Sequence, residues 1–374
     1  MGEILRAGKK YQAGQDVAGW YVSEKMDGQR LFWDGGASVG LPVKEVPWVN
    51  STWLRLHDTS MVCSGLWSRY LNPVICPLGV IGRLPLGIML DLEAWAGRGK
   101  FTTVQSVVRR FDATISDWVD GGVGLWVHDI VPGGALFEDR SGGRGARMEY
   151  GWRDWWLTRI RGLRDDRKLP VVAKPVLLAR HDLGFKFRLG ALRQIHADCH
   201  VSRAVSDAGR PGAMTAAVAW DPWGKVGWNV APHQAVNDYA EVQAQFDSVK
   251  AGGGEGLMLQ NPTGLWRAVR TDDLLKVKAS YSVNCTVTGW VEGKGKYIHM
   301  MGALVVQPEP GQDEPVTAPF QVGTGFDDAE RTLAWSGTDK YPRWYPVGTV
   351  VEIGYMDVTA DGLPREPRFL RVVN

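Results

Sequence analysis

Short apolar runs separated by turn residues extend through most of the chain and predict strands. The first clear run covers residues 20–23, and residues 29–33 return after the turn at Met26-Asp27-Gly28. Apolar runs of this length, bounded by glycine or aspartate, are typical of strands in a sheet. By the same criteria we expect further strands at 86–90, 125–128, 256–260 and 274–278. The run at 86–90 would end at Asp91-Leu92-Glu93.

Two segments have the three- and four-residue spacing of an amphipathic helix. The first follows the run at 86–90 and carries Val104, Val107, Val108 and Phe111. The second carries Tyr239, Val242, Phe246 and Val249. For the second helix, Asn237 is the predicted N-cap and Gly252 the predicted C-terminal stop.

The composition changes after Ala279, where five short β-rich runs follow one another. They lie at 283–291, 303–307, 320–324, 349–358 and 368–373. A short helix is expected at 327–335, between the third and fourth runs. Five strands with one helix indicate a small closed barrel of the oligonucleotide-binding (OB) kind. We therefore place a domain boundary near residue 280.

The middle of the chain is harder to interpret. Residues 132–147 are rich in glycine and arginine, and they form either a solvated connection or a cationic finger for DNA. The arginines of the finger would be Arg140, Arg144 and Arg147. Residues 150–225 give no clear pattern. Their tryptophans, which we expect to be structural, are Trp152, Trp155, Trp156, Trp220 and Trp223.

Bulk composition narrows the class only slightly. The 374 residues include 43 basic and 41 acidic side chains, so any nucleic-acid surface must be local. Large cores explain the 18 tryptophans better than extra stacking surfaces do. Neither a signal peptide nor a membrane-spanning run is expected.

The cysteines and histidines do not predict a metal site. No CxxC pair occurs among the four cysteines, Cys63, Cys76, Cys199 and Cys285. Reduced thiols in a cytoplasm therefore fit the sequence better than disulfides or a zinc ribbon. His196 and His200 could share a helix face. We interpret that face as solvated rather than as a metal pair.

Lys25 is the first candidate for chemistry, because it ends a strand and precedes a tight glycine turn. A lysine acts as a nucleophile only as the neutral amine, which burial and neighbouring cations favour. Lys276 and Lys278 are two residues apart on a predicted strand, so they point to the same face and could supply those cations. Taken alone, the Lys25 segment also fits an ordinary strand-turn-strand with charged ends.

Glu93 and Glu255 are the second candidates, since each lies at the end of a predicted strand. Two carboxylates there could hold Mg²⁺ between phosphate oxygens, because Mg²⁺ prefers oxygen ligands and keeps several waters. Ordinary salt bridges at strand edges are the alternative interpretation of each glutamate alone.

Taken in order, these segments resemble the motifs of ATP-dependent DNA ligases of the small phage and bacterial type, within the covalent nucleotidyltransferase superfamily. Two departures occur, since Leu92 replaces the usual glycine and the glycine that usually follows Ser68-Arg69 is absent. The matching segments are Lys25-Met26-Asp27-Gly28-Gln29-Arg30, Ser68-Arg69, Leu90-Asp91-Leu92-Glu93, Gly97-Arg98-Gly99-Lys100-Phe101, Glu255-Gly256-Leu257-Met258-Leu259 and Leu274-Leu275-Lys276-Val277-Lys278.

The resemblance continues into the predicted barrel and so covers nearly the whole chain, most weakly in the middle. The barrel segments are Gly293-Lys294-Gly295-Lys296-Tyr297, Gly302-Ala303-Leu304, Val322-Gly323-Thr324-Gly325-Phe326, Leu363-Pro364-Arg365 and Pro367-Arg368-Phe369-Leu370-Arg371. His128 stands where the family usually places an aromatic ring against adenine. The chain closes on Arg371-Val372-Val373-Asn374 instead of Arg-x-Asp-Lys, so the basic residues of the last motif are either missing or replaced by Arg365 or Arg368.

The resemblance implies an α+β fold with a nucleotidyltransferase (adenylation) domain at 1–280 and a β-barrel OB-fold domain at 281–374. It also implies that Lys25 takes AMP from ATP, passes it to the 5′-phosphate of a nick in double-stranded DNA, and thereby allows the 3′-hydroxyl to seal the strand. Glu24 and Arg30 would then contact the nucleoside, and Arg69 the nucleotide or DNA phosphate. Glu93 and Glu255 would serve the ribose or Mg²⁺, and Lys276 and Lys278 would hold the α-phosphate.

ATP is expected rather than NAD, because only 24 residues precede Lys25 and no four-cysteine zinc site follows the barrel. An RNA ligase or capping-type enzyme is one alternative, which the barrel sequence disfavours. A non-catalytic nucleic-acid-binding protein is the other, and the intact Lys25, Glu93 and Glu255 argue against it. We expect a monomer in the cytoplasm of a bacterium or of a phage-infected host.

Overall fold

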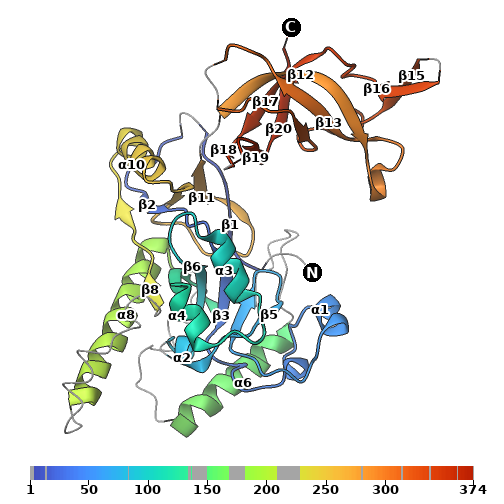
Figure 1. Cartoon of the computed structure of the whole chain (residues 1–374). Helices are drawn as coiled ribbons and strands as arrows, with labels where there is room; N and C mark the ends of the chain where they lie inside the picture. Colours follow the sequence, from blue (N-terminus) through green and yellow to red (C-terminus); the bar gives the residue numbers. More distant parts are fainter. Residues whose placement is uncertain are drawn as a thin grey trace. The chain divides into compact units, whose positions relative to one another are not determined.

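The computed structural model describes residues 4–12, 15–82, 84–133, 136, 150–167, 182–208, 228–278, 281–312, 315–336, 338–359 and 361–373 (Figure 1). Contacts divide the chain into a first unit, Met1–Val277, and a second, Lys278–Asn374, close to the predicted boundary. Arg140, Arg144 and Arg147 lie outside the described residues, as do Trp220 and Trp223.

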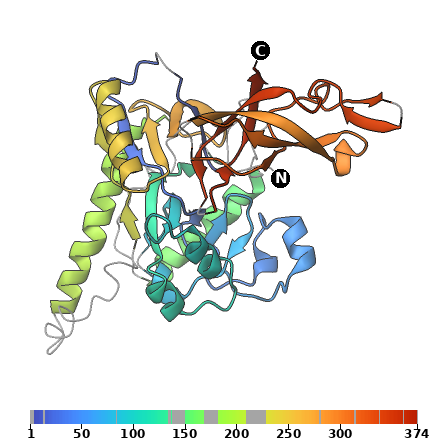
Figure 2. The same cartoon turned by 45° about the horizontal axis from the view of Figure 1, so that its top comes forward.

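The first sheet of unit one has five strands in the order β1-β11-β10-β2-β9. Its apolar face carries Val22, Leu257, Leu259 and Leu275, which pack against Val242 of helix α10. In both views α10, drawn in yellow and gold, lies beside this sheet (Figure 1, Figure 2). The elements are β1 (Ala7–Lys10), β2 (Tyr21–Glu24), β9 (Gln234–Ala235), α10 (Tyr239–Ala251), β10 (Gly256–Gln260) and β11 (Arg270–Lys278).

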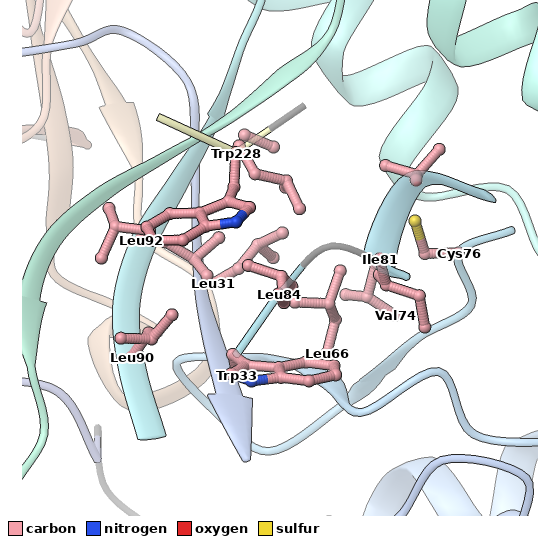
Figure 3. Close-up of a cluster of buried hydrophobic side chains, with 14 of the residues drawn as sticks. Leu31, Trp33, Leu66, Val74, Cys76, Ile81, Leu84, Leu90, Leu92 and Trp228 are labelled. Atoms are coloured by element: carbon pink, nitrogen blue, oxygen red, sulfur yellow. The ribbon is translucent and has the colours of Figure 1, made fainter. Parts of the chain in front are cut away.

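The second sheet of unit one has six strands in the order β5-β4-β3-β6-β7-β8. They are β3 (Gln29–Asp34), β4 (Leu66–Ser68), β5 (Pro73–Val74), β6 (Met89–Trp95), β7 (Gly124–Ile130) and β8 (Trp228–Val230). Alternation along these strands buries one face in a core that includes Leu31, Leu92 and Trp228 (Figure 3). The opposite face of β3 and β6 thus presents Arg30 and Glu93.

Helices cover the buried face of the six-stranded sheet. They are α2 (Leu78–Ile81), α3 (Phe101–Val108), α4 (Ile115–Asp120) and α8 (Phe185–Ala208). Val104, Trp118 and Leu192 bring α3, α4 and α8 into the same core. Further short elements are η1 (Val43–Glu45), α1 (Ser51–Leu56) and α6 (Tyr150–Arg167). Trp156 of α6 packs in a second cluster with Trp48 and Phe32, so the tryptophan there is structural.

The turn after β3 is held by a buried carboxylate. Asp34 accepts hydrogen bonds from the Gly36 amide at 2.9 Å, the Ser38 hydroxyl at 2.5 Å and the Trp67 indole at 3.0 Å. Complete burial raises the pKa of Asp34 to about 6, and these hydrogen bonds act against that rise. Asp34 is therefore a polar anchor inside the core for the turn that contains Gly35 and Gly36.

Most predicted elements of unit one are present, with shifted ends. The strand expected at 86–90 runs instead from Met89 to Trp95, so Glu93 lies within the strand rather than at its end. The helix expected to reach Phe111 ends at Val108, and the N-cap of α10 is Asp238 rather than Asn237. Apolar spacing located these elements, whereas local hydrogen bonds set their ends.

The second unit contains a five-stranded antiparallel sheet in the order β14-β13-β12-β17-β20. The strands are β12 (Tyr281–Glu292), β13 (Met301–Pro308), β14 (Phe320–Val322), β17 (Val350–Tyr355) and β20 (Arg368–Val372), with η2 (Gly295–Tyr297) between β12 and β13. Among the described residues, the edges β14 and β20 do not pair as a ladder. A single bridge between Thr324 and Arg368 joins them, so the predicted closed barrel is corrected to a sheet joined by one bridge.

The helix predicted at 327–335 is wrong. Asp327 and Glu330 form reciprocal bonds between amides and side chains, both 2.7 Å long, and these close a turn. The chain then forms a hairpin from β15 (Leu333–Ser336) and β16 (Asp339–Pro342). A smaller pair, β18 (Asp357–Val358) and β19 (Pro364–Arg365), precedes β20.

The described cysteines, Cys63, Cys76 and Cys285, are free and buried. Burial raises the pKa of the Cys63 and Cys285 thiols to about 12. His196 packs edge-on against Trp228, with ring centroids 4.7 Å apart. Within the ranges given above, no helix combines the length and hydrophobicity needed to cross a bilayer.

Candidate active site

Lys25 follows the last residue of β2 and faces the start of β10. Its amide donates to the Gly256 carbonyl at 2.8 Å, which continues the antiparallel pairing of the two strands. The side-chain Nζ lies 2.5 Å from Oε2 of Glu255, and the two side chains are 22% and 13% exposed. The structure therefore brings together the predicted nucleophile and one of the two predicted carboxylates.

Gly28 brings the turn after Lys25 against β6 of the other sheet. A Cβ atom at Gly28 would lie 2.2 Å from the Ala94 carbonyl oxygen and 2.9 Å from Cγ of Glu93. Only glycine fits so close a backbone approach. The Lys25 segment is thereby held beside the strand that carries Glu93.

Arg30, Asp91 and Glu93 form the opposite side of the site. The Arg30 guanidinium donates to both oxygens of Asp91, at 2.8 and 2.5 Å. Glu93 lies opposite Arg30 in the pairing of β3 and β6. Burial raises the pKa of Glu93 to about 8, and the nearby charges of Arg30 and Lys25 oppose the rise. With a pKa of about 8, this carboxyl is largely protonated at neutral pH.

His128 lies on the same face of the sheet, with Nε2 4.0 Å from Oε2 of Glu93. Burial, and then the charge of His233, lower the pKa of His128 to about 3. Burial also lowers the pKa of His233 to about 4. Both imidazoles are therefore neutral near pH 7.

A buried network of charged side chains holds the end of β7, the strand that carries His128. Arg188 of α8 donates to both oxygens of Asp129 at 2.8 Å, and also to the carbonyls of Leu183 and Gly264. Arg6 lies 3.7 Å from the same carboxylate. Asp129 is the neighbour of His128, so α8 fixes the end of β7 where His128 lies.

Glu24 is held by Arg98 from the segment after β6. Nε and Nη2 of Arg98 donate to the two Glu24 oxygens at 2.8 and 2.9 Å, and Nη1 donates to the Gly252 carbonyl at 3.1 Å. The Glu24 carboxylate, predicted to contact the nucleoside, has this arginine as its partner. Its contact with the nucleoside stays a prediction.

The lysines of β11 alternate with buried residues. Leu275 and Val277 face the α10 core, so Lys276 points to the other face of the sheet. The Asn261 amide donates to the Asp273 carbonyl, which sets the end of β10 beside the beginning of β11. Lys278 is the first residue of the second unit, and its Nζ lies 3.6 Å from Sδ of Met356.

Three further arginines were predicted to contact nucleotide or DNA. Arg69 follows β4, and its guanidinium lies over the Tyr70 ring at 4.9 Å. Arg365 and Arg368 are exposed residues of the second unit, in β19 and β20. The roles of these three arginines toward nucleotide or DNA stay predictions.

Three residues near the site were not predicted to be functional. Asp91 and Arg98 belong to the two motif segments that contain or follow Glu93. Charged side chains so close to a candidate carboxylate in the sequence could have indicated a role in the site. Trp126 alternates with the buried Leu125 and Val127 on β7, and it packs edge-on against Trp95 at 5.6 Å. The alternation alone puts Trp126 on the face of His128.

The comparisons with known proteins agree with this architecture. Residues 292–372 match the family model for the DNA ligase OB-like domain. A DNA ligase of Haemophilus influenzae is 30% identical over 118 residues, which are 32% of this chain and 38% of the relative. A solved Lig E DNA ligase superimposes with a TM-score of 0.58 at 23% identity, covering 100% of this chain and 99% of the other. The chain is therefore similar to DNA ligases, in sequence over part of its length and in fold over all of it.

At these sequence identities, the similarity to solved structures establishes the fold of the chain. A second solved structure, described as "Pmar-Lig_PreS3", gives a TM-score of 0.54 at 17% identity and covers 98% of this chain and 67% of the other. The chain thus has the fold of these solved structures, a mixed α+β unit followed by an OB-like unit, as predicted. The matched segment spans well under half of the curated relative from Haemophilus influenzae.

Proposed function

We propose that this chain is an ATP-dependent DNA ligase that seals nicks through an AMP carried on Lys25. The observation that supports this best is the approach of Lys25 Nζ to Glu255 at 2.5 Å, beside Glu93 and Arg30 of the facing sheet. The carboxylate fixes the position of the lysine and can accept its proton, and the neutral amine that results can attack a bound phosphate.

Three phosphoryl transfers make up the proposed reaction. Lys25 Nζ loses a proton and forms a bond to the α-phosphorus of ATP, and the bond to pyrophosphate breaks. An oxygen of the 5′-phosphate at the nick then attacks the same phosphorus, which breaks the N–P bond and returns the amine. Finally the 3′-hydroxyl oxygen attacks the 5′-phosphate and AMP leaves. Alignment and charge neutralisation supply most of the catalysis in such transfers.

The side chains around Lys25 have separate roles in this proposal. Glu255 orients the amine, and Lys276 and Lys278 neutralise the α-phosphate. Arg30, fixed by Asp91, contacts the nucleoside. The neutral His128, on the same face of the sheet as Glu93, stacks on adenine.

Glu93 and Glu255 are suitable ligands for Mg²⁺. Among the described residues no cluster of three or more acidic, histidine or cysteine side chains occurs. Mg²⁺ nevertheless needs only one or two carboxylates when substrate phosphates and waters complete its shell. When bound, Mg²⁺ would neutralise charge on the phosphate oxygens and keep the buried Glu93 ionised.

Nicked duplex DNA is the proposed partner, contacted by a monomer. Arg69 and the exposed Arg365 and Arg368 are the described candidates for phosphate contacts, and Arg140, Arg144 and Arg147 are added from the sequence. We place the enzyme in the cytoplasm of a bacterium or of a phage-infected host.

Sealing of a 5′-labelled nick tests the proposal. We expect wild type with ATP and Mg²⁺ to join nicked duplex DNA, and NAD not to replace ATP. Lys25→Ala should not join the strands. Joining of a nicked RNA duplex without joining of DNA would favour the RNA ligase alternative. Binding of nicked DNA without any joining would favour a non-catalytic binding protein.

A further inference from the structure

One guanidinium connects both segments that carry the Lys25–Glu255 pair. Arg98 belongs to the loop between β6 and α3, on the six-stranded sheet. Its partners, Glu24 and the Gly252 carbonyl, belong to the five-stranded sheet and to the end of α10. Arg98 therefore bridges the two sheets of unit one on the side where Lys25 lies.

The two partners of Arg98 are close in sequence to the reacting pair. Glu24 immediately precedes Lys25, so a fixed Glu24 side chain restricts the backbone from which Lys25 extends. The Gly252 carbonyl begins the three-glycine segment that leads into Glu255. Glycine runs have much backbone freedom, which an external hydrogen bond at one end reduces.

Close packing around the three glycines agrees with a fixed conformation. The Gly254 amide donates to the Val249 carbonyl at 2.8 Å. A Cβ atom at Gly254 would lie 2.4 Å from Cγ1 of Val249 and 3.0 Å from Oε1 of Glu24. The segment thus passes directly beside the carboxylate that Arg98 holds.

We infer that Arg98 is a positioning residue that keeps Lys25 and Glu255 in register for attack on ATP. The inference rests on the proposed ligase function and deepens it. Arg98 acts through Glu24 and Gly252 rather than on the substrate. Its planar fork makes three directed bonds, which a lysine ammonium cannot reproduce with the same geometry.

A purely structural role would give a different result from a positioning role. Arg98 is 35% exposed, and ion pairs exposed to water contribute little to stability. Small errors in the alignment of reacting groups, in contrast, cost about 10- to 100-fold in rate. Loss of Arg98 should therefore change the chemical step and leave the melting temperature nearly unchanged.

The experiment measures the rate of AMP transfer to full-length protein from α-labelled ATP, over a range of ATP concentrations. Arg98→Ala should lower the maximal rate about 10- to 100-fold without raising the half-saturating ATP concentration. Arg98→Lys should rescue only part of the rate. Arg110→Ala is the matched control, since Arg110 binds two exposed carboxylates, Asp112 and Asp117, in the same unit.

Gly252→Ala gives an independent variant that leaves Arg98 in place. The new Cβ would lie 1.9 Å from Nη1 of Arg98, so the flexible guanidinium must move away. Gly252 has a φ of −85°, which alanine can adopt. This variant should lower the maximal rate as Arg98→Ala does. In maximal rate, combining Arg98→Ala with Glu24→Ala should cost no more than Arg98→Ala alone, since both remove the same interaction. The predicted contact of Glu24 with the nucleoside would change the half-saturating ATP concentration instead.

The outcomes separate the inference from the proposed function. A labelled wild type with an equally fast Arg98→Ala would overturn the inference alone. A raised half-saturating ATP concentration at unchanged maximal rate would also overturn it, because Arg98 would then contact ATP. An unlabelled wild type would overturn the proposed function and the inference with it.

Discussion

Arg30 and Asp91 form a two-point ion pair across neighbouring strands, with the guanidinium donating to both carboxylate oxygens at 2.8 and 2.5 Å. Asp91 is almost fully buried, whereas the Arg30 side chain is 27% exposed. The aspartate thus holds the arginine from inside the sheet and leaves part of it open toward the site. Glu93, two residues further along β6, faces the same side.

Asp91→Asn should weaken the hold on the Arg30 guanidinium while keeping a side chain of the same size at position 91. An amide offers one acceptor oxygen in place of two charged ones, so the fork geometry is lost. We expect the rate of lysine adenylylation to fall about tenfold through misalignment of Arg30. Asp112→Asn, which alters an exposed pair with Arg110, should leave the rate unchanged. Equal rates for the two variants would refute a role of Asp91 in the site.

Gly28→Ala should separate the Lys25 turn from β6. The added methyl would lie 2.2 Å from the Ala94 carbonyl, so the backbone of the turn must shift. Adenylylation should fall about 100-fold, since such a shift displaces the nucleophile. Gly190→Ala on α8, where a Cβ meets no atom within 4 Å, is the control and should retain full activity. Full activity in Gly28→Ala would contradict the close approach as a catalytic requirement.

Asp34 should make stability depend on pH in a defined window. Its folded pKa of about 6 lies above its ordinary value of 3.8, so the folded state holds a proton that the unfolded state has released. Its contribution to the free energy of unfolding therefore falls as pH rises from 3.8 to about 6, and is constant above. In wild type, this group should lower the free energy of unfolding by about 2–3 kcal/mol between these two pH values. Asp34→Asn should abolish that decrease.

Urea unfolding across the acidic and neutral pH range measures this dependence. Asp58→Asn is a suitable control, because Asp58 makes similar turn bonds to Ser60 but is fully exposed, and those bonds lower its pKa. The control should keep the wild-type dependence between about pH 4 and 6. A wild-type slope that persists in Asp34→Asn would assign the pH dependence to other groups.

The arginines predicted to form a finger are testable through salt. Replacing Arg140, Arg144 and Arg147 with alanine should weaken binding to nicked DNA. The slope of log affinity against log salt should fall by about 0.9 for each phosphate that the variant no longer neutralises. The control variant replaces Lys44, Arg109 and Arg110 with alanine, which removes the same amount of charge from other positions and should leave the salt slope unchanged. An unchanged slope in the finger variant would exclude these arginines from the DNA interface.

The fold was well predicted where apolar periodicity is regular. The strands around Lys25 and Glu255, helix α10 and most of the second unit follow from alternation and helical spacing. The helix predicted at 327–335 failed because a hydrogen-bonded turn at Asp327 and a long-range hairpin compete with local helical preference there. The closed barrel was predicted wrongly, since pairing of the edge strands depends on the packing of the whole sheet, and among the described residues only the bridge at Thr324 joins them.

The candidate site was predicted in its residues but not in its partners. Lys25, Glu93 and Glu255 were selected from motif order, and the structure places them on facing sheets. That Arg98 would bind Glu24, or that α8 would send Arg188 to Asp129, has no signal in local spacing. These two interactions join positions 74 and 59 residues apart, and only the folded chain shows them.

Transfer of AMP to Lys25 is the central claim, and labelling measures it most directly. Full-length protein is incubated with α-labelled ATP and Mg²⁺ and separated under denaturing conditions, beside Lys25→Ala and protein shown by mass to carry no AMP. The account predicts label on wild type, none on Lys25→Ala, and release of the label as AMP when nicked DNA is added. Label retained by Lys25→Ala, or absent from wild type, would contradict it.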